Sequence, residues 1–446
     1  VPALLSLSTA ANAAGLTNSS MTTYVDSVSL NFNFDPVKAA YWTGYIHHRR
    51  TPFAVSPSGS VAYLAYLDGS GTDVHVQAID PTTFEASGIN VTISGGKEAG
   101  GLQWKTWLGG PNVTDAEGHM AATDMNGDLV YSNATGRYAA YTVVTAYDGD
   151  ADGHFGDAIR YIEDTTGEIV VIDGASSDWG CSHNTGIALE AADAAPYASV
   201  CAEDQGGIWL NSKGQGMTTE GVKISNENTT NGADGEPMGG MSGSYSNLAR
   251  WQDGDGYIFA WVSRGAIDLY ENAWMGTGYT SAYNRTNGRN VAVATFTDKY
   301  TMVEAEASST VGAASGDSQV NWLTTTTTAD MSNAHVATFD GTNALVTWEE
   351  IADPFCEYVA FGCRGTFSGA YYQLVTNTGN GTAVGEPLVK SDVYVSGDLV
   401  TMGDGRICWP YVNMDWDLDG IVGWTYTSTN VTKMSFACVS LDGSSS

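Results

Sequence analysis

A two-strand unit recurs along the chain and constrains its fold more than any other feature. Each unit has a short strand of small residues, a glycine-containing turn such as SG, NG or DG, a second and more apolar strand, and a variable loop. The second strands are expected at 62–67, 138–144, 197–201, 257–262, 344–348 and 407–412. The small-residue strands that precede them are expected at 53–55, 120–123, 185–189, 246–250, 336–339 and 399–402. Such recurrence predicts an all-β repeat fold.

The small residues of the first strands favour a β-propeller, because the inner strands of propeller blades crowd around a central channel. We expect a single propeller domain over 24–446, preceded by an N-terminal extension over 1–23. A β-sandwich or a β-helix is the competing fold, and the large irregular loops between strand pairs argue against the β-helix.

The segment 24–34 alternates between apolar and polar residues, with one face made of Val28, Leu30, Phe32 and Phe34. This pattern predicts a half-buried strand. An N-terminal strand that completes the last blade helps a propeller to close its ring and protect its edges.

The number of blades depends on a short stretch after residue 97. A seventh inner strand is expected at 97–102, but only about 20 residues separate it from the next one, where a four-stranded blade takes about 40. Either the ring has six blades and an insertion, or a seventh blade lacks sequence near Leu102. We favour seven blades, which requires residues 102 and 103 to lie farther apart than the Cα spacing of about 3.8 Å across one peptide bond.

The charge of the chain excludes several classes of partner. The 446 residues include 18 basic and 50 acidic ones, a formal net charge of −32. Such a protein repels nucleic acid and anionic membranes. The chain has no apolar run of the length of a membrane span, and 1–14 resembles the end of a signal peptide.

Cysteines and glycosylation sequons predict a secreted glycoprotein. The six cysteines fall into sequential pairs, although six cysteines permit 15 connectivities. The expected disulfides are Cys181–Cys201, Cys356–Cys363 and Cys408–Cys438. The N-x-[ST] sequons are at Asn18, Asn90, Asn112, Asn133, Asn228, Asn284, Asn380 and Asn430. Both features indicate an extracellular location.

Four of the seven histidines occupy the same place in the repeat, just before or at the start of an inner strand: His48, His119, His183 and His335. Because these starts gather at one mouth of a propeller channel, we expect the four side chains to converge there. Imidazole at such a site can act as a general base, a general acid or a metal ligand. The alternative is that each histidine forms a hydrogen bond to a neighbouring blade.

Basic and polar residues accompany these histidines. Arg49, Arg50 and Lys97 would form a pocket for a carboxylate within an acidic protein, and Tyr245 and Asn333 add donor groups at equivalent positions. Tryptophans such as Trp416 could stack on sugars, although most aromatic residues of a propeller pack between blades.

A D-x-D-x-D-G pattern occurs twice and predicts structural Ca²⁺ loops, because alternate carboxylates supply oxygen ligands and the glycine allows a sharp turn. The first loop has Asp148, Asp150 and Asp152, which Asp157 would complete, and the second has Asp415, Asp417 and Asp419. Solvated acidic turns are the alternative.

The motifs RRTPFAVSPSGSVAYLAYLD, WGCSHNTGIALEAAD, CAEDQGGIWLN, GEPMGGMSGSY and CWPYVNM resemble those of secreted fungal proteins. The resemblance covers most of 24–440 and extends to the seven-bladed propeller polysaccharide lyases of the rhamnose–glucuronate lyase type. It implies β-elimination beside a uronic acid, and therefore an acidic glycan as partner.

The resemblance also implies roles for residues. Arg49, Arg50 or Lys97 would neutralise the carboxylate, His119 or His183 would be the base, and Tyr245 or His48 the acid. In related lyases a divalent metal held by histidines neutralises the carboxylate instead, and the histidine cluster permits that arrangement. The rival hypothesis is a non-catalytic glycan-binding or structural extracellular glycoprotein.

Overall fold

Short antiparallel strands make up the part of the chain that the structure describes, and this part contains no α-helix. The structure is a computed structural model. It describes residues 15–39, 46–49, 51–55, 59–69, 74–93, 120–121, 127–132, 137–145, 155–163, 169–170, 181–182, 187–190, 198–203, 207–210, 222–226, 247–252, 254–271, 280–284, 286–304, 320–356, 363–396, 398–416 and 430–441.

Three of the described sheets are four-stranded meanders whose strands follow one another along the chain. The first consists of β4 (Phe53–Val55), β5 (Ala62–Leu67), β6 (Val74–Ile79) and β7 (Ala86–Ile93). The second consists of β14 (Ile187–Glu190), β15 (Ala198–Glu203), β16 (Gly207–Leu210) and β17 (Val222–Asn226). The third consists of β25 (Ala329–Thr338), β26 (Asn343–Phe355), β27 (Arg364–Thr376) and β28 (Thr382–Lys390).

Three further sheets keep this order with variations. One contains β8 (Met120–Ala121), β9 (Gly127–Ser132), β10 (Arg137–Thr145), β11 (Phe155–Glu163), β12 (Ile169–Val170) and β13 (Cys181–Ser182). Another contains β18 (Leu248–Arg250), β19 (Tyr257–Ser263), β22 (Asn290–Asp298), β23 (Thr301–Met302) and β24 (Asn321–Trp322). In the last, the order is β29 (Val400–Thr401), β30 (Ile407–Tyr411), β31 (Val431–Val439) and β1 (Met21–Phe34).

Two separate hairpins complete the described strands. The strands β2 (Val37–Ala39) and β3 (Ile46–His48) form one, and β20 (Ala266–Glu271) and β21 (Thr280–Asn284) form the other. Two short 3-10 helices, Asn18–Ser20 and Thr378–Asn380, lie before β1 and before β28.

The predicted strand pairs are confirmed in all six repeats. Each expected second strand overlaps β5, β10, β15, β19, β26 or β30, and each pairs antiparallel with the small-residue strand that precedes it. The repeat in the sequence is therefore a repeat of sheets.

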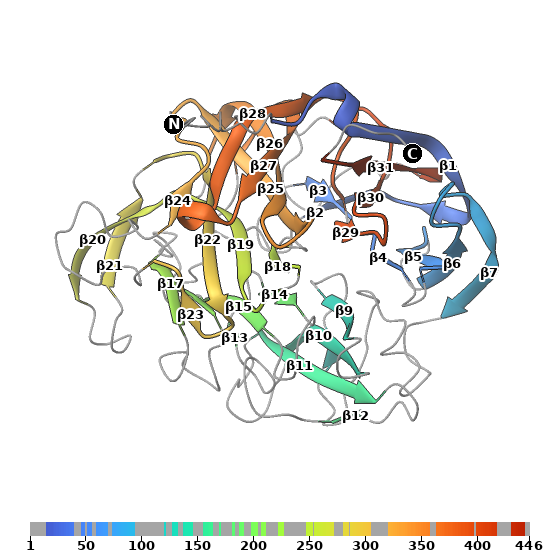
Figure 1. Ribbon diagram of the computed structural model, residues 1–446, viewed down its shortest axis with the longest axis horizontal. Coiled ribbons are helices and arrows are strands. Elements are labelled where there is room, and N and C mark those ends of the chain that lie inside the picture. Colours follow the sequence, from blue (N-terminus) through green and yellow to red (C-terminus); the bar gives the residue numbers. More distant parts are fainter. Residues whose placement is uncertain are drawn as a thin grey trace, which may run out of the picture.

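The sheets are arranged around a centre, as Figure 1 shows, with β4, β14, β18, β25 and β29 toward the middle of the view. These inner strands also contact one another in chain order, β14 with β18, β18 with β25, β25 with β29, and β29 with β4. Radial four-stranded meanders with neighbouring inner strands are the architecture of propeller blades. Seven blades stays a prediction, and the stretch around Leu102 lies outside the described residues.

The described core is divided into layers between adjacent sheets. One cluster includes Leu345 and Tyr372 from the β25–β28 sheet, and Ile407 and Trp409 from the sheet beside it. A second contains Phe53 and Leu64 from the β4–β7 sheet together with Phe436 of β31. Burial of these side chains removes apolar surface from water and holds each sheet against the next.

The strand β1 is the outer strand of the C-terminal sheet, where it pairs with β31 from Met21↔Val439 to Phe34↔Val431. It begins three residues earlier than the domain boundary that we expected at residue 24. Val28, Leu30 and Phe34 are buried as predicted. Phe32 is the exception, because it is 43% exposed and stacks on the imidazole of His75, with ring centroids 3.8 Å apart.

Polar bridges join neighbouring sheets where the inner strands begin. The Asn247 side chain, just before β18, donates to the carbonyl of Ala334 over 2.9 Å. Asn333, at an irregularity of β25, donates to the carbonyl of Val395 over 2.7 Å. The hydroxyls of Thr51, before β4, and Ser396, before β29, lie 3.2 Å apart. Four neighbouring sheets are thus connected in order.

A second series joins the other ends of three inner strands. Thr401 donates to the carbonyl of Thr338 over 2.7 Å, and the Thr338 hydroxyl donates to the carbonyl of Arg250 over 2.7 Å. The inner strands β18, β25 and β29 therefore run side by side in one direction.

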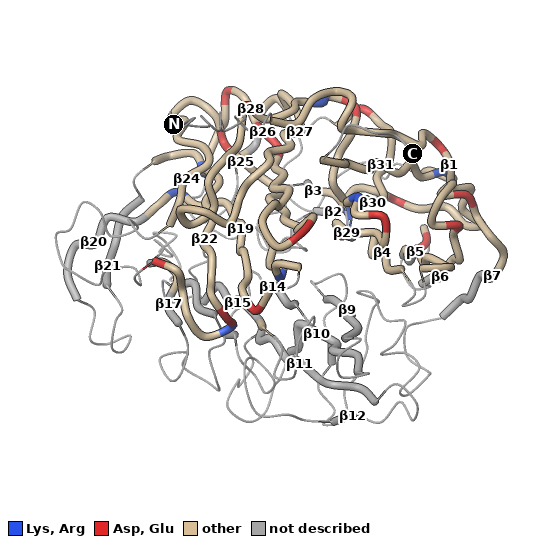
Figure 2. Tube along the Cα trace, in the orientation of Figure 1, with Lys and Arg blue, Asp and Glu red and all other residues tan. Residues whose placement is uncertain are grey.

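Two of the three expected disulfides are confirmed, Cys356–Cys363 and Cys408–Cys438. The side chains of Cys181 and Cys201 lie outside the described part. No helix among the described residues is long and apolar enough to cross a membrane. Figure 2 shows acidic residues spread over many of the described elements.

The described sequon side chains differ in accessibility. Asn18 and Asn430 are exposed, although the Lys390 ammonium donates to the Asn18 amide oxygen over 2.8 Å. Asn380 is only 4% exposed, and its amide oxygen accepts the backbone N–H of Thr295 over 2.8 Å. A glycan on this buried amide does not fit the fold, which corrects our expectation for Asn380. The side chains of the other five sequon asparagines are not described.

We predict that glycopeptide mapping of the secreted protein finds Asn380 unmodified. The substitution Asn380→Ala should lower the free energy of unfolding by about 1–3 kcal/mol, because it leaves the buried Thr295 N–H without its acceptor. Asn430→Ala, at an exposed sequon, is the matched control and should change stability by less than about 0.5 kcal/mol in urea unfolding. Occupancy of Asn380 by a glycan would contradict the assignment.

Candidate functional site

A buried histidine–glutamate pair lies at the end of the β2–β3 hairpin. Figure 1 shows this hairpin toward the centre of the sheets. His48 is the last residue of β3, and its Nε2 is 2.5 Å from Oε1 of Glu349 on β26. The two side chains are only 7% and 5% exposed. A carboxylate at this distance fixes the orientation of the imidazole ring, as second-sphere carboxylates do in catalytic and metal sites.

Glu349 is positioned by the central strands of its sheet. It pairs with Ser332 of β25 and with Ala370 of β27. In β26 the residues Leu345, Thr347, Glu349 and Ile351 share one face, since side chains alternate along a strand. This face packs into the apolar layer against the neighbouring sheet. The carboxylate thus occupies a core position, where an unpaired charge would be costly.

Aromatic rings enclose the His48 side chain. The Trp416 ring stacks on the imidazole with centroids 3.7 Å apart and an interplanar angle of 13°. The centroid of Tyr394 lies 5.6 Å from that of His48. Trp416 is 5% exposed, so it packs in the interior, the alternative that we gave for such tryptophans, and does not form an exposed sugar platform. Instead it limits access of water to His48.

The tyrosines around Glu349 are held in their protonated form. Burial, followed by the negative charge of Glu349, raises the pKa of Tyr394 to about 12. Burial and the same carboxylate also raise the pKa of Tyr372 well above its ordinary value of 10.0. Their hydroxyls donate to backbone carbonyls, that of Tyr394 to Ser391 over 3.0 Å and that of Tyr372 to Val393 over 2.8 Å. At neutral pH both phenols are therefore protonated, and they donate their hydroxyl hydrogens to these backbone carbonyls.

His335 lies on the same face as the His48–Glu349 pair. It pairs with Thr347, which lies two residues before Glu349 on β26, and an irregularity of β25 separates this pair from the Ser332–Glu349 pair. Its Nε2 is 2.9 Å from Oδ1 of Asn333. Since Asn333 also donates to Val395, both ends of its amide contact protein. These two contacts hold the Asn333 side chain in place, and its role in binding substrate stays a prediction.

Two buried polar atoms in this region have no hydrogen-bond partner among the described residues, Thr347 Oγ1 and Trp416 Nε1. Thr347 is 1% exposed and lies two residues before Glu349 on β26. A buried polar group without a partner costs about 1–3 kcal/mol, and such groups in folded proteins call for an explanation. A hydroxyl-bearing ligand would supply partners for both atoms.

Arg49 follows His48 and is partly exposed. Its Nε donates to the carbonyl of Asp35 over 2.9 Å, and its NH2 group donates to the carbonyl of Val37 over 3.4 Å. These bonds hold the guanidinium beside β2. Arg49 is thus fixed in place and is the next residue in the chain after His48.

The remaining predicted residues are not tested. His119, His183, Tyr245, Arg50 and Lys97 lie outside the described residues, and so do the side chains of the first Asp-rich loop. Of the aspartates in the second loop only Asp415 is described, and its side chain is exposed. Convergence of the four histidines therefore stays a prediction.

Our sequence interpretation missed Glu349. The available signal was its position in the alternating segment NALVTWEEIADPF, where Glu349 falls on the same strand face as Leu345 and Ile351. A charged residue at an apolar position of an alternating strand indicates a buried partner. The partner itself, His48, is 301 residues away, which no local pattern can supply.

We predict strong energetic coupling between His48 and Glu349. Glu349→Ala should lower the free energy of unfolding by about 3–5 kcal/mol, because it leaves a buried imidazole without its partner. His48→Ala combined with Glu349→Ala should cost clearly less than the sum of the two single substitutions in urea unfolding.

The exposed pair Arg250–Asp255, with an N–O distance of 3.1 Å, is the matched control. The double-mutant cycle of this pair should give a coupling energy of less than about 1 kcal/mol. Additive effects of the His48 and Glu349 substitutions would contradict the coupling.

Comparison with known proteins identifies no family, since no protein-family model and no curated protein matches the chain. Among solved structures, a mutant of the NanB sialidase from Streptococcus pneumoniae matches with a TM-score of 0.40 and 8% identity, covering 94% of this chain and 71% of that one. A polysaccharide lyase of family PL25, an ulvan lyase bound to GlcA(1-4)Rha3S, matches with a TM-score of 0.36 and 10% identity, covering 81% and 74%.

The arabinofuranosidase of family GH93 from Fusarium graminearum matches with a TM-score of 0.33 and 10% identity, covering 83% of this chain and 73% of that one. These three are enzymes that act on glycans, but a hydrazine synthase from Kuenenia stuttgartiensis is also among the matches. Likenesses this remote do not assign an activity, so any function must be argued from the chain's own residues.

Proposed function

We propose that the protein is a secreted carbohydrate-active enzyme that acts on an acidic glycan. In this proposal it is a polysaccharide lyase that cleaves beside a uronic acid by β-elimination. The reaction takes place where the inner strands begin, near His48.

The observation that carries the proposal is the surroundings of the His48–Glu349 pair. An imidazole held by a buried carboxylate at 2.5 Å packs beside a protonated phenol, and Arg49 is the next residue in the chain. Two neighbouring polar atoms, Thr347 Oγ1 and Trp416 Nε1, have no partner among the described residues. A set of oriented acid–base groups next to unsatisfied polar atoms is typical of a binding or catalytic site.

The chemistry assigned to these groups is an elimination. A base removes the proton from C5 of the uronate, the electron pair forms the C4–C5 double bond, and the glycosidic oxygen leaves C4 with a proton from an acid. His48 is the proposed acid, and Arg49 is the proposed partner of the uronate carboxylate. The base is assigned to His119 or His183 on the family resemblance alone.

The proposed metal sites are kept apart from this mechanism. The Asp-rich loops would bind structural Ca²⁺ through carboxylate oxygens. A divalent metal held by the histidine cluster would polarise the uronate carboxylate in place of an arginine. Secretion is supported by the two described disulfides, which persist in oxidising compartments.

A second function is favoured by one observation. His48 is nearly buried and connects the β2–β3 hairpin to the β25–β28 sheet. This is the contact expected of a structural histidine in a glycan-binding or structural glycoprotein. The two hypotheses differ in whether a covalent product forms.

The test is incubation with glucuronate-capped arabinogalactan and other uronate glycans, followed through the ultraviolet absorbance of the unsaturated uronate. We expect product from the wild-type protein and a rate about 10²–10⁴-fold lower for His48→Gln, the usual effect of removing a general acid.

His75→Gln is the matched control, because His75 is also buried and its Nε2 is 2.8 Å from Asp68 Oδ2. This control should keep the wild-type rate. Binding of the glycans without any unsaturated product would overturn the lyase and favour the binding protein. If His48→Gln and His75→Gln both kept the wild-type rate, the role assigned to His48 would be overturned, but the lyase activity would not.

A further inference from the structure

The disulfide Cys356–Cys363 differs from the other described disulfide in the exposure of its cysteines and in the charged groups beside it. It connects the end of β26 to the start of β27, across a sequence separation of 7 residues. Cys363 is 6% exposed, whereas Cys356 is partly exposed. An approaching thiolate therefore reaches the sulfur of Cys356 more easily than that of Cys363.

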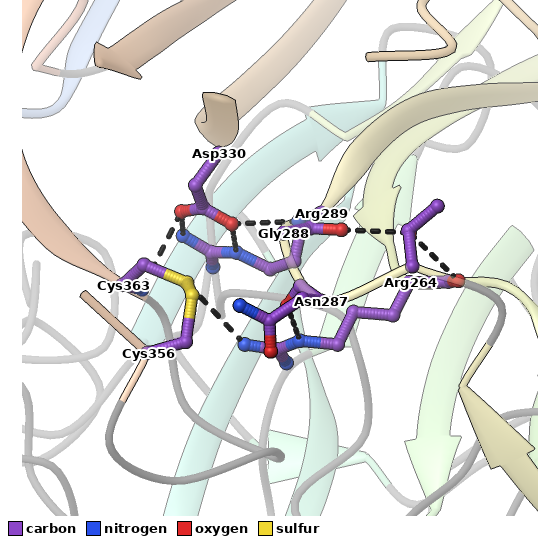
Figure 3. The surroundings of a disulfide bond; sticks show 8 residues. Arg264, Asn287, Gly288, Arg289, Asp330, Cys356 and Cys363 are labelled. Carbon is purple, nitrogen blue, oxygen red and sulfur yellow. Dashed lines mark hydrogen bonds and ion pairs between the residues drawn. A yellow bond between two sulfur atoms is a disulfide. The ribbon is translucent and has the colours of Figure 1, made fainter. Parts of the chain in front are cut away.

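A buried arginine contacts the less accessible sulfur, as Figure 3 shows. The Arg264 NH2 group is 3.7 Å from Cys363 Sγ, and the Arg264 residue is 4% exposed. Its Nε donates to the carbonyl of Asn287 over 2.7 Å, which fixes the guanidinium in place. Electrostatic attraction between a buried cation and a thiolate is stronger than the same attraction in water.

A second arginine near this disulfide, Arg289, is paired with an aspartate. Arg289 forms a buried bidentate pair with Asp330, at 3.1 Å and 2.7 Å (Figure 3). Asp330 also accepts the backbone N–H of Cys363 over 3.4 Å. Of the described charged side chains that face Cys363, two are arginines and one is an aspartate. Among the described residues, Arg264 is the cation in hydrogen-bond contact with the Cys363 sulfur.

The second described disulfide provides an internal contrast. Cys408 and Cys438 face each other across β30 and β31, and they are 0% and 1% exposed. Among the described residues, no side chain forms a hydrogen bond to either of their sulfurs. Both cysteines are buried, and the described residues supply no cation in hydrogen-bond contact with their sulfurs.

We propose that Cys356–Cys363 is a site of reversible thiol–disulfide exchange with a dithiol reductant. A thiolate of the reductant attacks Cys356 Sγ, the S–S bond breaks, and Cys363 leaves as a thiolate beside Arg264. The second thiol of the reductant then attacks the mixed disulfide, releasing Cys356 as a thiol and the reductant as its disulfide. Two electrons pass from the dithiol to the protein, and rates follow leaving-group stability and access.

The experiment is a time course of reduction of the folded, full-length protein by dithiothreitol, quenched by alkylation and read by peptide mapping. Cys356–Cys363 should be reduced before Cys408–Cys438 under conditions in which the protein stays folded. Reduction of both at the same rate, or of Cys408–Cys438 first, would overturn the proposal.

The direction of the change in reduction rate distinguishes an electrostatic role of Arg264 from a structural one. Arg264→Gln should slow reduction of Cys356–Cys363 by about threefold to tenfold, because the leaving thiolate loses its cation. Loosening of the structure would instead speed reduction. Arg264→Lys should keep most of the wild-type rate, and Arg406→Gln, at a distant arginine, should leave it unchanged. Faster or unchanged reduction in Arg264→Gln would contradict the assignment.

A second measurement covers the case in which Arg264→Gln fails to fold. In the Cys356→Ser variant, the free Cys363 thiol should react with iodoacetamide at pH 7 several times faster than a buried thiol without a cation, such as Cys438 in a Cys408→Ser variant. Raising the pH toward 10 should accelerate the reaction of Cys438 more than that of Cys363, because the thiol without a cation ionises at higher pH. Equal rates at pH 7 would overturn the proposal.

Discussion

The hydrogen bonds between neighbouring inner strands are the interactions on which the rest of the described structure depends. Apolar contacts between sheets are non-directional, so they permit sheets to slide against each other. Asn247, Asn333 and Thr51 bridge one sheet to the next where the inner strands begin, and Thr401 and Thr338 do so at the other end. Directional bonds at both ends fix the register of the sheets around the centre.

This register has chemical consequences. It brings the β2–β3 hairpin against β26, so that His48 reaches Glu349 within an apolar layer. In that low-dielectric surrounding the carboxylate raises the pKa of Tyr394 to about 12, after burial itself. The same sheet carries Asp330, which with Arg289 and Arg264 surrounds the disulfide at the end of β26. Both candidate sites thus depend on buried charges that the sheet packing positions.

Much of the fold could be predicted from the sequence, because strand periodicity and glycine turns are local properties. The paired strands of all six repeats and two disulfides follow from such patterns. The exceptions depend on distant contacts. Phe32 has the apolar phase of β1 but covers His75, and Trp416 stacks on His48. Asn380 carries a sequon, but its buried amide oxygen accepts the backbone N–H of Thr295 on β22. The partner of His48 could not be predicted for the same reason.

In the proposed function, the His48–Glu349 pair belongs to a glycan site where the inner strands begin. A crystal structure of the protein with a glucuronate-capped oligosaccharide bound tests this directly. We expect a uronate within hydrogen-bond distance of His48 and Arg49, with sugar hydroxyls bonded to Thr347 Oγ1 or Trp416 Nε1. A sugar bound only at the opposite ends of the inner strands, or only on the outer strands, would contradict it.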